Sequence, residues 1–262
     1  MSIFRNELKR GWISAVIFGG IISFMLAVCV LIYPEMKGQM NEMNQMFSEM
    51  GAFSEAFGMD QLDFGTLVGY YGVECGNVLG IGGALFSAFL GIRALSGEEA
   101  GRTAEFLLTH PVRRSRLIME KLLAVLAQII SLNLLIVLPV MLSFAIIGES
   151  VPLQEFVLIH LAYLILQIEI ALLCFGLSGL LRGNGIAIGM GLAMGLYFLS
   201  LVANITESAE FLRYITPFSY AAASDIVSDL SLDIWLILLG LGYGVALTVG
   251  GSLYYLKKDI YT

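Results

Sequence analysis

Charged residues are scarce in this sequence, and their scarcity indicates the class of protein. Asp, Glu, Lys and Arg make up 13% of the 262 residues, about half the share of a soluble domain, whereas 58% are hydrophobic. The mean hydropathy is +0.86. A water-soluble core of this size does not hide so much apolar surface, so the lipid bilayer is the expected solvent of most of the chain. The basic residues form no patch typical of nucleic-acid binding.

Cysteine and histidine are also rare, which argues against disulfides, metal sites and protease chemistry. Cys29, Cys75 and Cys174 lie in separate apolar runs and predict buried thiols. The two histidines form no HExxH zinc motif. Residues 176–179, Gly-Leu-Ser-Gly, match the GxSG of intramembrane serine proteases, but both histidines precede Ser178, and that chemistry needs a base on a later span. We expect no catalytic residue and no metal ligand in this chain.

Six apolar runs are long enough to cross a bilayer, which takes about 20 residues. The runs are 12–33, 66–92, 117–147, 154–181, 185–203 and 234–256. The second, third and fourth exceed the minimum, which predicts tilting, kinking or projection beyond the membrane, with Pro139 as the candidate kink in the third. The expected fold class is therefore all-α, a single polytopic transmembrane domain over 1–262. The first run lacks a small-residue cleavage site, so we expect a retained anchor rather than a signal peptide.

Lysine and arginine are divided unevenly between the two sides of this topology. If the N-terminus is cytoplasmic, twelve of them lie inside, and only Lys37 and Arg213 lie outside. Cytoplasmic loops carry an excess of Lys and Arg. We therefore expect a multi-pass plasma-membrane protein of bacterial type with both termini in the cytoplasm, and an amphipathic helix over 1–11 along the inner membrane face.

Two long segments fall on the predicted outer side. The segment 34–65 is acidic, and its Met and Phe residues recur at helical spacing, which predicts an amphipathic helix. Such methionines pack against apolar surfaces more often than they bind a soft metal. The segment 204–233 is too apolar for a solvated loop and too broken for a span. We expect short re-entrant helices there, with a turn at Pro217.

The inner loop 93–116 interrupts the apolar pattern with charge. Ser96 and Glu99 match a capping box, and Pro111 ends the helix that they would begin. The charged face of this predicted helix carries Glu98, Arg102 and Glu105. The helix either lies on lipid headgroups or docks on a soluble partner. Surface-lying helices usually carry Lys or Arg on the polar face, so this mixed, acid-led face favours the partner.

This loop resembles the cytoplasmic loop that follows the second span in type-2 ABC transporter permeases. The matching residues are Glu98, Glu99, Gly101, Thr103, Glu105, Leu107, Leu108, Pro111, Val112 and Arg114, with Lys121 opening the third span. Arg102 separates Gly101 from Thr103, which are usually adjacent in the family. A second stretch, RYITPFSY at 213–220, resembles the Ser/Thr-Pro-Phe stretch between the family's fifth and sixth spans. Together with six spans, these landmarks cover almost the whole chain.

The resemblance implies the permease subunit of an ATP-driven exporter of amphipathic compounds such as peptides, drugs or lipids. In such families the loop is a coupling helix held in a cleft of a separate ATPase. The coupling residues so implied are Glu98, Glu99, Arg102, Glu105, Phe106 and Arg113. The chain has no GxxxxGK[ST] phosphate loop, so ATP and Mg²⁺ would bind to two copies of an ATPase subunit. A second permease, identical or homologous, and membrane lipid are the other expected partners.

Polar side chains inside the predicted spans are the candidates for a translocation path, because such groups are costly in lipid. They are Glu169, Gln128, Asn133, Glu74 and Asn77. Glu169 near the middle of the fourth span is expected either to form a hydrogen bond with Gln128 or Asn133 or to face a wet cavity. An ion-coupled secondary transporter with Glu169 as its ion or proton site is the alternative function, although no inverted repeat supports it.

Glycines recur every four residues in several spans. They lie at 72, 76 and 80, at 185 and 189, at 191 and 195, and at 240 and 244. This spacing lets membrane helices approach closely. We expect it to serve packing within the chain or an interface with a second permease.

Overall fold

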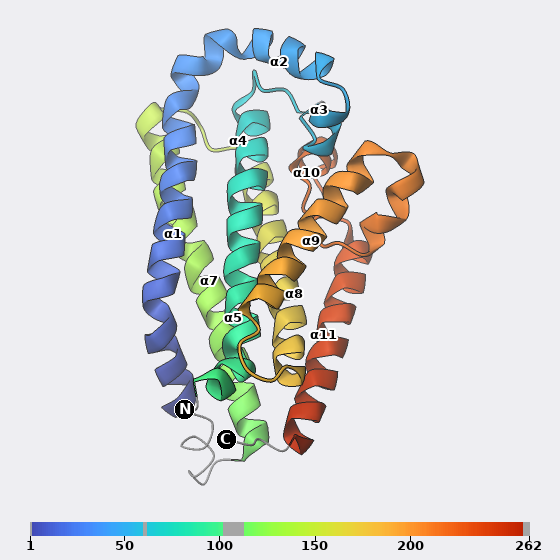
Figure 1. The fold of residues 1–262 in the computed structure, drawn as a ribbon. Helices are drawn as coiled ribbons and strands as arrows, with labels where there is room; N and C mark the ends of the chain where they lie inside the picture. The colour runs from blue at the N-terminus through green and yellow to red at the C-terminus, as the bar shows by residue number, and fades with distance from the viewer. Residues whose placement is uncertain (1, 60–61, 102–112, 259–262) are drawn as a thin grey trace.

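The computed structural model describes residues 2–59, 62–101 and 113–258, and helices dominate them (Figure 1). The long helices are α1 (Ser2–Met36), α4 (Leu67–Cys75), α5 (Ile81–Ala100), α7 (Arg114–Ile147), α8 (Leu153–Leu180), α9 (Ile186–Ile205) and α11 (Ile234–Lys257). A π-helical turn, η2 (Gly76–Gly80), joins α4 to α5 without a break. The described part of the chain contains no strand.

Six helical segments are long and apolar enough to cross a membrane, as the sequence predicted. Five of them are single helices, and the second is the continuous run from α4 through η2 to α5. The N-terminal segment differs from the expectation of a separate amphipathic helix over 1–11. Its described residues form the first turns of α1, which continues unbroken through Gly19 and Gly20 to Met36, since no proline precedes Pro34.

Local side-chain chemistry sets several helix ends. Thr66 caps α4 by accepting a hydrogen bond from the Gly69 amide, and Asp233 caps α11 by accepting from the amides of Trp235 and Leu236. Such caps satisfy amides that a helix start leaves without partners. Gly148 ends α7 with a φ of 73°, a left-handed conformation that glycine adopts without a steric penalty.

The second and fourth spans form the centre of the bundle (Figure 1). In both, 61% of the most apolar window is buried, against 33% for α1 and 22% for α11, which places the latter two at the periphery. Figure 1 shows α1 beside α7 on one flank and α11 beside α8 on the other. The outward faces of these helices expose large apolar side chains such as Phe24, Leu138 and Trp235, as expected where lipid replaces water.

Small residues bring α8 and α11 into backbone contact. A methyl group added at Gly251 would lie 2.0 Å from the Gly176 carbonyl oxygen, and one added at Gly176 would lie 2.4 Å from the Leu247 carbonyl. The expected packing role of spaced glycines is confirmed for Gly240, where added carbon would meet the Glu169 carboxylate. Gly191 and Gly195 have no neighbour within 4 Å, so they do not mediate helix packing within the described chain.

The predicted outer segment 34–65 folds as several short helices over one end of the bundle (Figure 1). They are η1 (Lys37–Gln39), α2 (Met40–Glu49) and α3 (Ala52–Ala56). Phe47 of α2 stacks on Phe64 with ring centroids 4.8 Å apart. Asn44 accepts a hydrogen bond from the Phe64 amide and donates one to Asp63. The amphipathic helix predicted here is therefore real, and its inner face is fixed by a stacked ring pair.

The second predicted outer segment consists of η3 (Glu207–Tyr214), a turn at Thr216 and Pro217, and α10 (Ala223–Asp229). The Thr216 hydroxyl donates a 2.7 Å hydrogen bond to the Leu196 carbonyl of α9. The short helices and the turn at Pro217 agree with the sequence prediction, and their re-entry into the outer leaflet stays a prediction.

The predicted cytoplasmic loop begins differently from the expectation. The helix α5 runs on to Ala100, so Ser96 lies inside it and donates its hydroxyl to the Ile92 carbonyl one turn earlier. The predicted capping box of Ser96 and Glu99 is therefore wrong, because an uninterrupted helix leaves no free amides there to cap. The predicted coupling helix, from Ser96 to the residue before Pro111, therefore has its first residues at the end of α5, and residues 102–112 lie outside the described part of the chain.

Candidate functional site

The end of the bundle that carries the first turns of α1 and the end of α5 holds a buried ionic cluster; we call it the basal end. Lys121, near the start of α7, donates hydrogen bonds to Glu7 of α1 at 2.7 Å and to Glu98 of α5 at 2.9 Å. The side chains of Lys121 and Glu98 are only 3% and 6% exposed. Arg10 lies 3.5 Å from the same oxygen of Glu98. Three helices are thus joined through one ammonium group.

The sequence positions this cluster by helical spacing. Glu7 and Arg10 are three residues apart and share one face of α1, while Glu98 lies near the end of α5, on the last turns before the loop. A buried ion pair is costly to form and more costly to break, since removing one partner leaves an uncompensated charge. The cluster therefore fixes the mutual position of α1, α5 and α7 at the basal end.

A second set of contacts ties the other helices together at the basal end. Arg114, the first residue of α7, donates to the carbonyls of Leu256 and Lys258 at 3.3 and 2.8 Å. Lys258 is 5% exposed, and its ammonium donates a 2.6 Å hydrogen bond to the Leu181 carbonyl, directly after α8. A cation at the C-terminal end of a helix is stabilised by the helix dipole. The start of α7 is therefore attached to the ends of α8 and α11.

The predicted coupling residues divide into three groups. Glu98 is buried in the ionic cluster, so its carboxylate contacts Lys121 rather than solvent. Glu99 lies in the last turn of α5, and Arg113 is exposed immediately before α7. The remaining predicted coupling residues, Arg102, Glu105 and Phe106, lie outside the residues that the structure describes. Contact of any of these residues with an ATPase stays a prediction.

Glu169 in the fourth span has a partner that the sequence did not indicate. Tyr220, from the segment between α9 and α11, donates a 2.8 Å hydrogen bond to the Glu169 carboxylate, and both side chains are buried. The expected bond from Gln128 or Asn133 does not form, because those residues pair elsewhere or line another pocket. Burial raises the pKa of Tyr220 well above its ordinary value, and the nearby Glu169 carboxyl raises it further. The Tyr220 hydroxyl therefore stays a donor.

Asn133 and Gln167 form a separate buried pair between the third and fourth spans. The Asn133 amide donates a 2.7 Å hydrogen bond to Gln167 Oε1 and a second, of 2.9 Å, to the Ile129 carbonyl. Gln167 is fully buried, and Gly83 of α5 leaves room for its amide. A bond of this kind replaces contacts with water that a membrane helix cannot make. The pair links two helices.

Glu74 and Asn77 lie further toward the other end of the bundle. Glu74 accepts a long contact of 3.6 Å from the Cys29 thiol of α1. Asn77 lies in the π-helical turn η2 and lines a small cavity of about 70 Å³ beside Tyr163 and Tyr197. Such turns often occur at functional sites, but nothing in the composition of 76–80 distinguished them from ordinary helix.

The buried basal cluster was only partly accessible to sequence reasoning. Glu98 and Lys121 were singled out through the family resemblance, whereas Glu7 was treated as part of an amphipathic surface helix. The available signal was a lysine inside the apolar run that opens the third span. A charged residue in such a place is expected to have a partner, but the partner's identity required the packing of α1 against α7.

Six apolar helices around buried polar pairs define a multi-pass helical membrane protein, with a buried ionic cluster at its basal end. The model of the ABC-2 family transporter protein matches residues 1–260. Because this match spans nearly the whole chain, the protein belongs to the ABC-2 family of transporter proteins. It is accordingly a membrane permease subunit of an ABC transporter, whose ATPase is a separate partner. A search of curated proteins found no match.

Proposed function

We propose that this chain is the permease of an ATP-driven exporter and that its basal cluster transmits movement from the ATPase to the spans. The observation that carries the proposal is the position of Lys121 between Glu7 and Glu98. In the sequence, the segment 102–112 connects the end of α5 to the start of α7. The Lys121–Glu98 pair joins these two flanks, so they respond to a force on this segment together.

The attachment of the flanks explains how a local push reaches distant helices. The cluster connects α5 and α7 to α1, and the contacts of Arg114 and Lys258 connect α7 to α8 and α11. Densely packed helices move as bodies rather than bending locally. Docking of Arg102, Glu105 and Phe106 on an ATPase would therefore shift five spans rather than one loop.

The partners follow from what this chain lacks. Two ATPase copies would bind ATP and Mg²⁺, since the chain has no phosphate-binding loop. A second permease, identical or homologous, would complete the transporter. Gly191 and Gly195 form an open surface on α9, and a helix of the second permease could approach it closely. Both termini would lie in the cytoplasm of a bacterial cell, in agreement with the inner excess of Lys and Arg.

The direction and cargo are proposed as outward movement of amphipathic compounds such as peptides, drugs or lipids. The segment 34–65 carries six acidic residues and one lysine, which suits a cationic amphipathic cargo on the outer side. Neutralising Glu42, Glu49 and Glu55 is expected to lower resistance to such a peptide. Unchanged export by that variant would remove the cargo assignment and leave the coupling proposal intact.

Co-purification tests the coupling proposal. The permease is extracted in a mild detergent with its candidate ATPase, and retention of the ATPase is compared among variants. Charge reversal at Arg102 and Glu105 is expected to release the ATPase, whereas reversal of the exposed Arg182 at the end of α8 is the matched control and should not. Retained ATPase and retained ATP-dependent transport after replacement of 102–112 by Gly/Ser would overturn the proposal.

Family membership favours this function over the ion-coupled alternative. An ion-coupled transporter would need Glu169 to titrate during transport, but its described contact is a hydrogen bond from a buried tyrosine. Substitution Glu169→Gln distinguishes the two functions. ATP-dependent transport should survive it if the proposal is right, and loss of transport with ATPase coupling intact would favour the alternative.

A further inference from the structure

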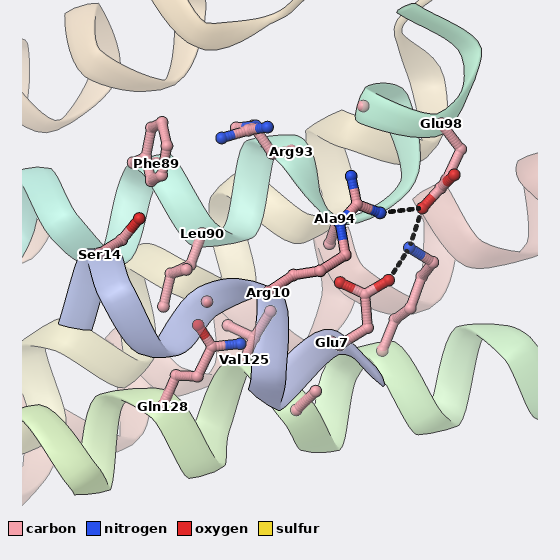
Figure 2. A pocket seen from close by; sticks show the side chains of 14 residues that line it. Glu7, Arg10, Ser14, Phe89, Leu90, Arg93, Ala94, Glu98, Val125 and Gln128 are labelled. Atoms are coloured by element: carbon pink, nitrogen blue, oxygen red, sulfur yellow. Dashed lines mark hydrogen bonds and ion pairs between the residues drawn. The ribbon is translucent and has the colours of Figure 1, made fainter. Parts of the chain in front are cut away.

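A pocket that the ionic cluster helps to line opens at the basal end, and the coupling proposal requires no ligand in it (Figure 2). The pocket lies between α1, α5 and α7 and has a volume of about 130 Å³. A water molecule takes about 30 Å³ of liquid, so the pocket has room for a small polar group. Polar side chains from all three helices line it: Arg10 and Ser14 of α1, Arg93 of α5 and Gln128 of α7.

The charged side chains that line this pocket include one more cation than anions. Glu7 and Glu98 are balanced by Lys121 and Arg10, which contact them directly. Arg93 is exposed and lies over the ring of Phe89, with its guanidinium 4.8 Å from the ring centroid. Within the described structure no carboxylate is paired with Arg93. The pocket therefore has a net charge of about one positive unit, which matches a phosphodiester.

The guanidinium groups lie where an anion could reach them. Arg10 is 59% exposed and only 3.5 Å from one oxygen of Glu98, so most of its donors remain free for a further acceptor. Figure 2 shows the side chain of Arg10 rising from α1 toward α5, which carries Arg93. Guanidinium groups bind phosphate oxygens in a planar, two-point geometry. Two such groups from different helices suit a phosphate at the mouth of the pocket.

The inner part of the pocket contains a buried hydrogen-bond acceptor rather than a cation. Gln128 is 5% exposed, and its Oε1 has no hydrogen-bond partner among the described residues. Gly11 leaves the space that this amide fills, since added carbon there would lie 1.7 Å from Oε1. Figure 2 shows Gln128 reaching from α7 into the space below Ser14. A buried acceptor without a donor is costly, so a hydroxyl or ammonium group would be stabilised here.

The neighbouring surface places the pocket at the level of lipid headgroups. Trp12 is 55% exposed and follows Arg10 by two residues on α1, and Ile13 and Ile17 continue an exposed apolar face. Tryptophan gathers at the boundary between headgroups and acyl chains. The pocket therefore lies beside an exposed tryptophan and an exposed apolar face of the same helix, α1.

We propose that this pocket binds the headgroup of a membrane phospholipid whose phosphodiester is followed by a hydroxyl or ammonium group. Arg10 and Arg93 hold the phosphate, Gln128 and Ser14 accept from the headgroup, and the acyl chains follow the exposed apolar face of α1. The ionic pair of Glu98 and Arg10 orients the guanidinium. The binding requires no particular direction of transport.

Native mass spectrometry of the full-length permease in detergent tests this proposal. Phosphatidylethanolamine, phosphatidylglycerol and phosphatidylcholine are added at equal concentrations, with inorganic phosphate as a fourth arm. We expect one phosphatidylethanolamine or phosphatidylglycerol to be retained per chain. Phosphatidylcholine, whose headgroup has no donor, should be retained less by about fivefold, as for loss of one charge-assisted hydrogen bond.

The variants locate the binding in this pocket. Substitution Arg93→Gln should lower retention by about fivefold or more, while Arg182→Gln removes an exposed arginine outside the pocket and should leave retention unchanged. Substitutions Gln128→Leu and Ser14→Ala should reduce the preference over phosphatidylcholine. Each variant is first shown to be monodisperse, and Ser14→Ala serves if Gln128→Leu does not fold.

Three results would overturn the proposal. Equal retention by the Arg93 and Arg182 variants would place the lipid elsewhere. Equal retention of phosphatidylcholine would contradict the donor recognised by Gln128. Displacement of the lipid by an equal concentration of inorganic phosphate would identify a site for free anions. The assay uses neither nucleotide nor ATPase, so its failure leaves the coupling proposal standing.

Discussion

The hydroxyl of Tyr220 donates a 2.8 Å hydrogen bond to the Glu169 carboxylate, and this bond attaches the segment between α9 and α11 to the interior of α8. Glu169 also lies against Gly240 of α11, where a side chain would occupy the same space as the carboxylate. One buried acid thus meets two other parts of the chain. In the described structure it holds the segment between α9 and α11 against the fourth span.

The first prediction concerns this bond. Substitution Tyr220→Phe leaves the Glu169 carboxylate without its buried donor and should destabilise the protein by about 1–3 kcal/mol. The exposed Tyr243 of α11 provides the matched control, since Tyr243→Phe removes a hydroxyl that has no buried partner. Unfolding in SDS, followed by tryptophan fluorescence, measures both. Equal stability of the two variants would show that the bond contributes nothing.

The second prediction concerns the ionic cluster. Substitution Lys121→Met leaves Glu98 buried without its ammonium partner and should cost about 3–5 kcal/mol. Adding Glu7→Gln and Glu98→Gln removes the uncompensated charge and should restore most of the loss. The control Arg116→Gln breaks an ion pair between the exposed Arg116 and Glu120, which lies one helical turn further along α7. This substitution should leave stability almost unchanged.

The same unfolding assay can contradict this role of the ionic cluster. If Lys121→Met and Arg116→Gln behave alike, the cluster does not fix the basal end, and the proposed connection between the loop flanks loses its support. If the triple variant is no more stable than Lys121→Met alone, the loss comes from packing rather than from charge.

The third prediction uses two adjacent glycines of α11. Substitution Gly251→Ala places a methyl group 2.0 Å from the Gly176 carbonyl oxygen and forces α8 and α11 apart, which should cost about 1–3 kcal/mol. Gly250 has no neighbour within 4 Å, so Gly250→Ala should be neutral or slightly stabilising. The neighbouring positions share helix, depth and substitution. A similar loss at both would contradict the observed contact of the two helices.

The fourth prediction is a double-mutant cycle on the pair of Asn133 and Gln167. Each single substitution, Asn133→Leu or Gln167→Met, leaves the other amide without its partner and should destabilise the protein. The double variant should cost less than the sum of the two, with a coupling of about 0.6 kcal/mol and at most about 1.7, as for other hydrogen bonds between membrane helices. Strict additivity would show that the 2.7 Å contact has no energetic consequence.

Sequence reasoning located the six spans well because the signal is local. A run of about 20 apolar residues needs no partner to be recognised, and all six expected runs coincide with helices of the structure. Helix ends were less accessible. The motif at Ser96 and Glu99 looks like a start, yet α5 continues through both residues because its apolar face remains packed on the centre of the bundle.

Partners across the bundle could not be predicted from the chain alone. Glu169 was expected to pair with Gln128 or Asn133 because these lie in the adjacent span of the sequence, but helix rotation directs it to Tyr220, which is 51 residues away. Gln128 instead faces Gly11 of α1. A rotation of one helix by a few tens of degrees changes every such pairing without any change in hydropathy.

The sequence by itself determined that this protein spans a membrane and how many helices are long and apolar enough to do so. These properties depend on composition and run length, both of which are read along one dimension. Only the tertiary structure decided that Lys121 joins α1 to α5 and that Arg93 lines a pocket with Gln128. Such contacts depend on how helices are rotated and packed, because a polar group in lipid must take whichever partner the packing brings within reach.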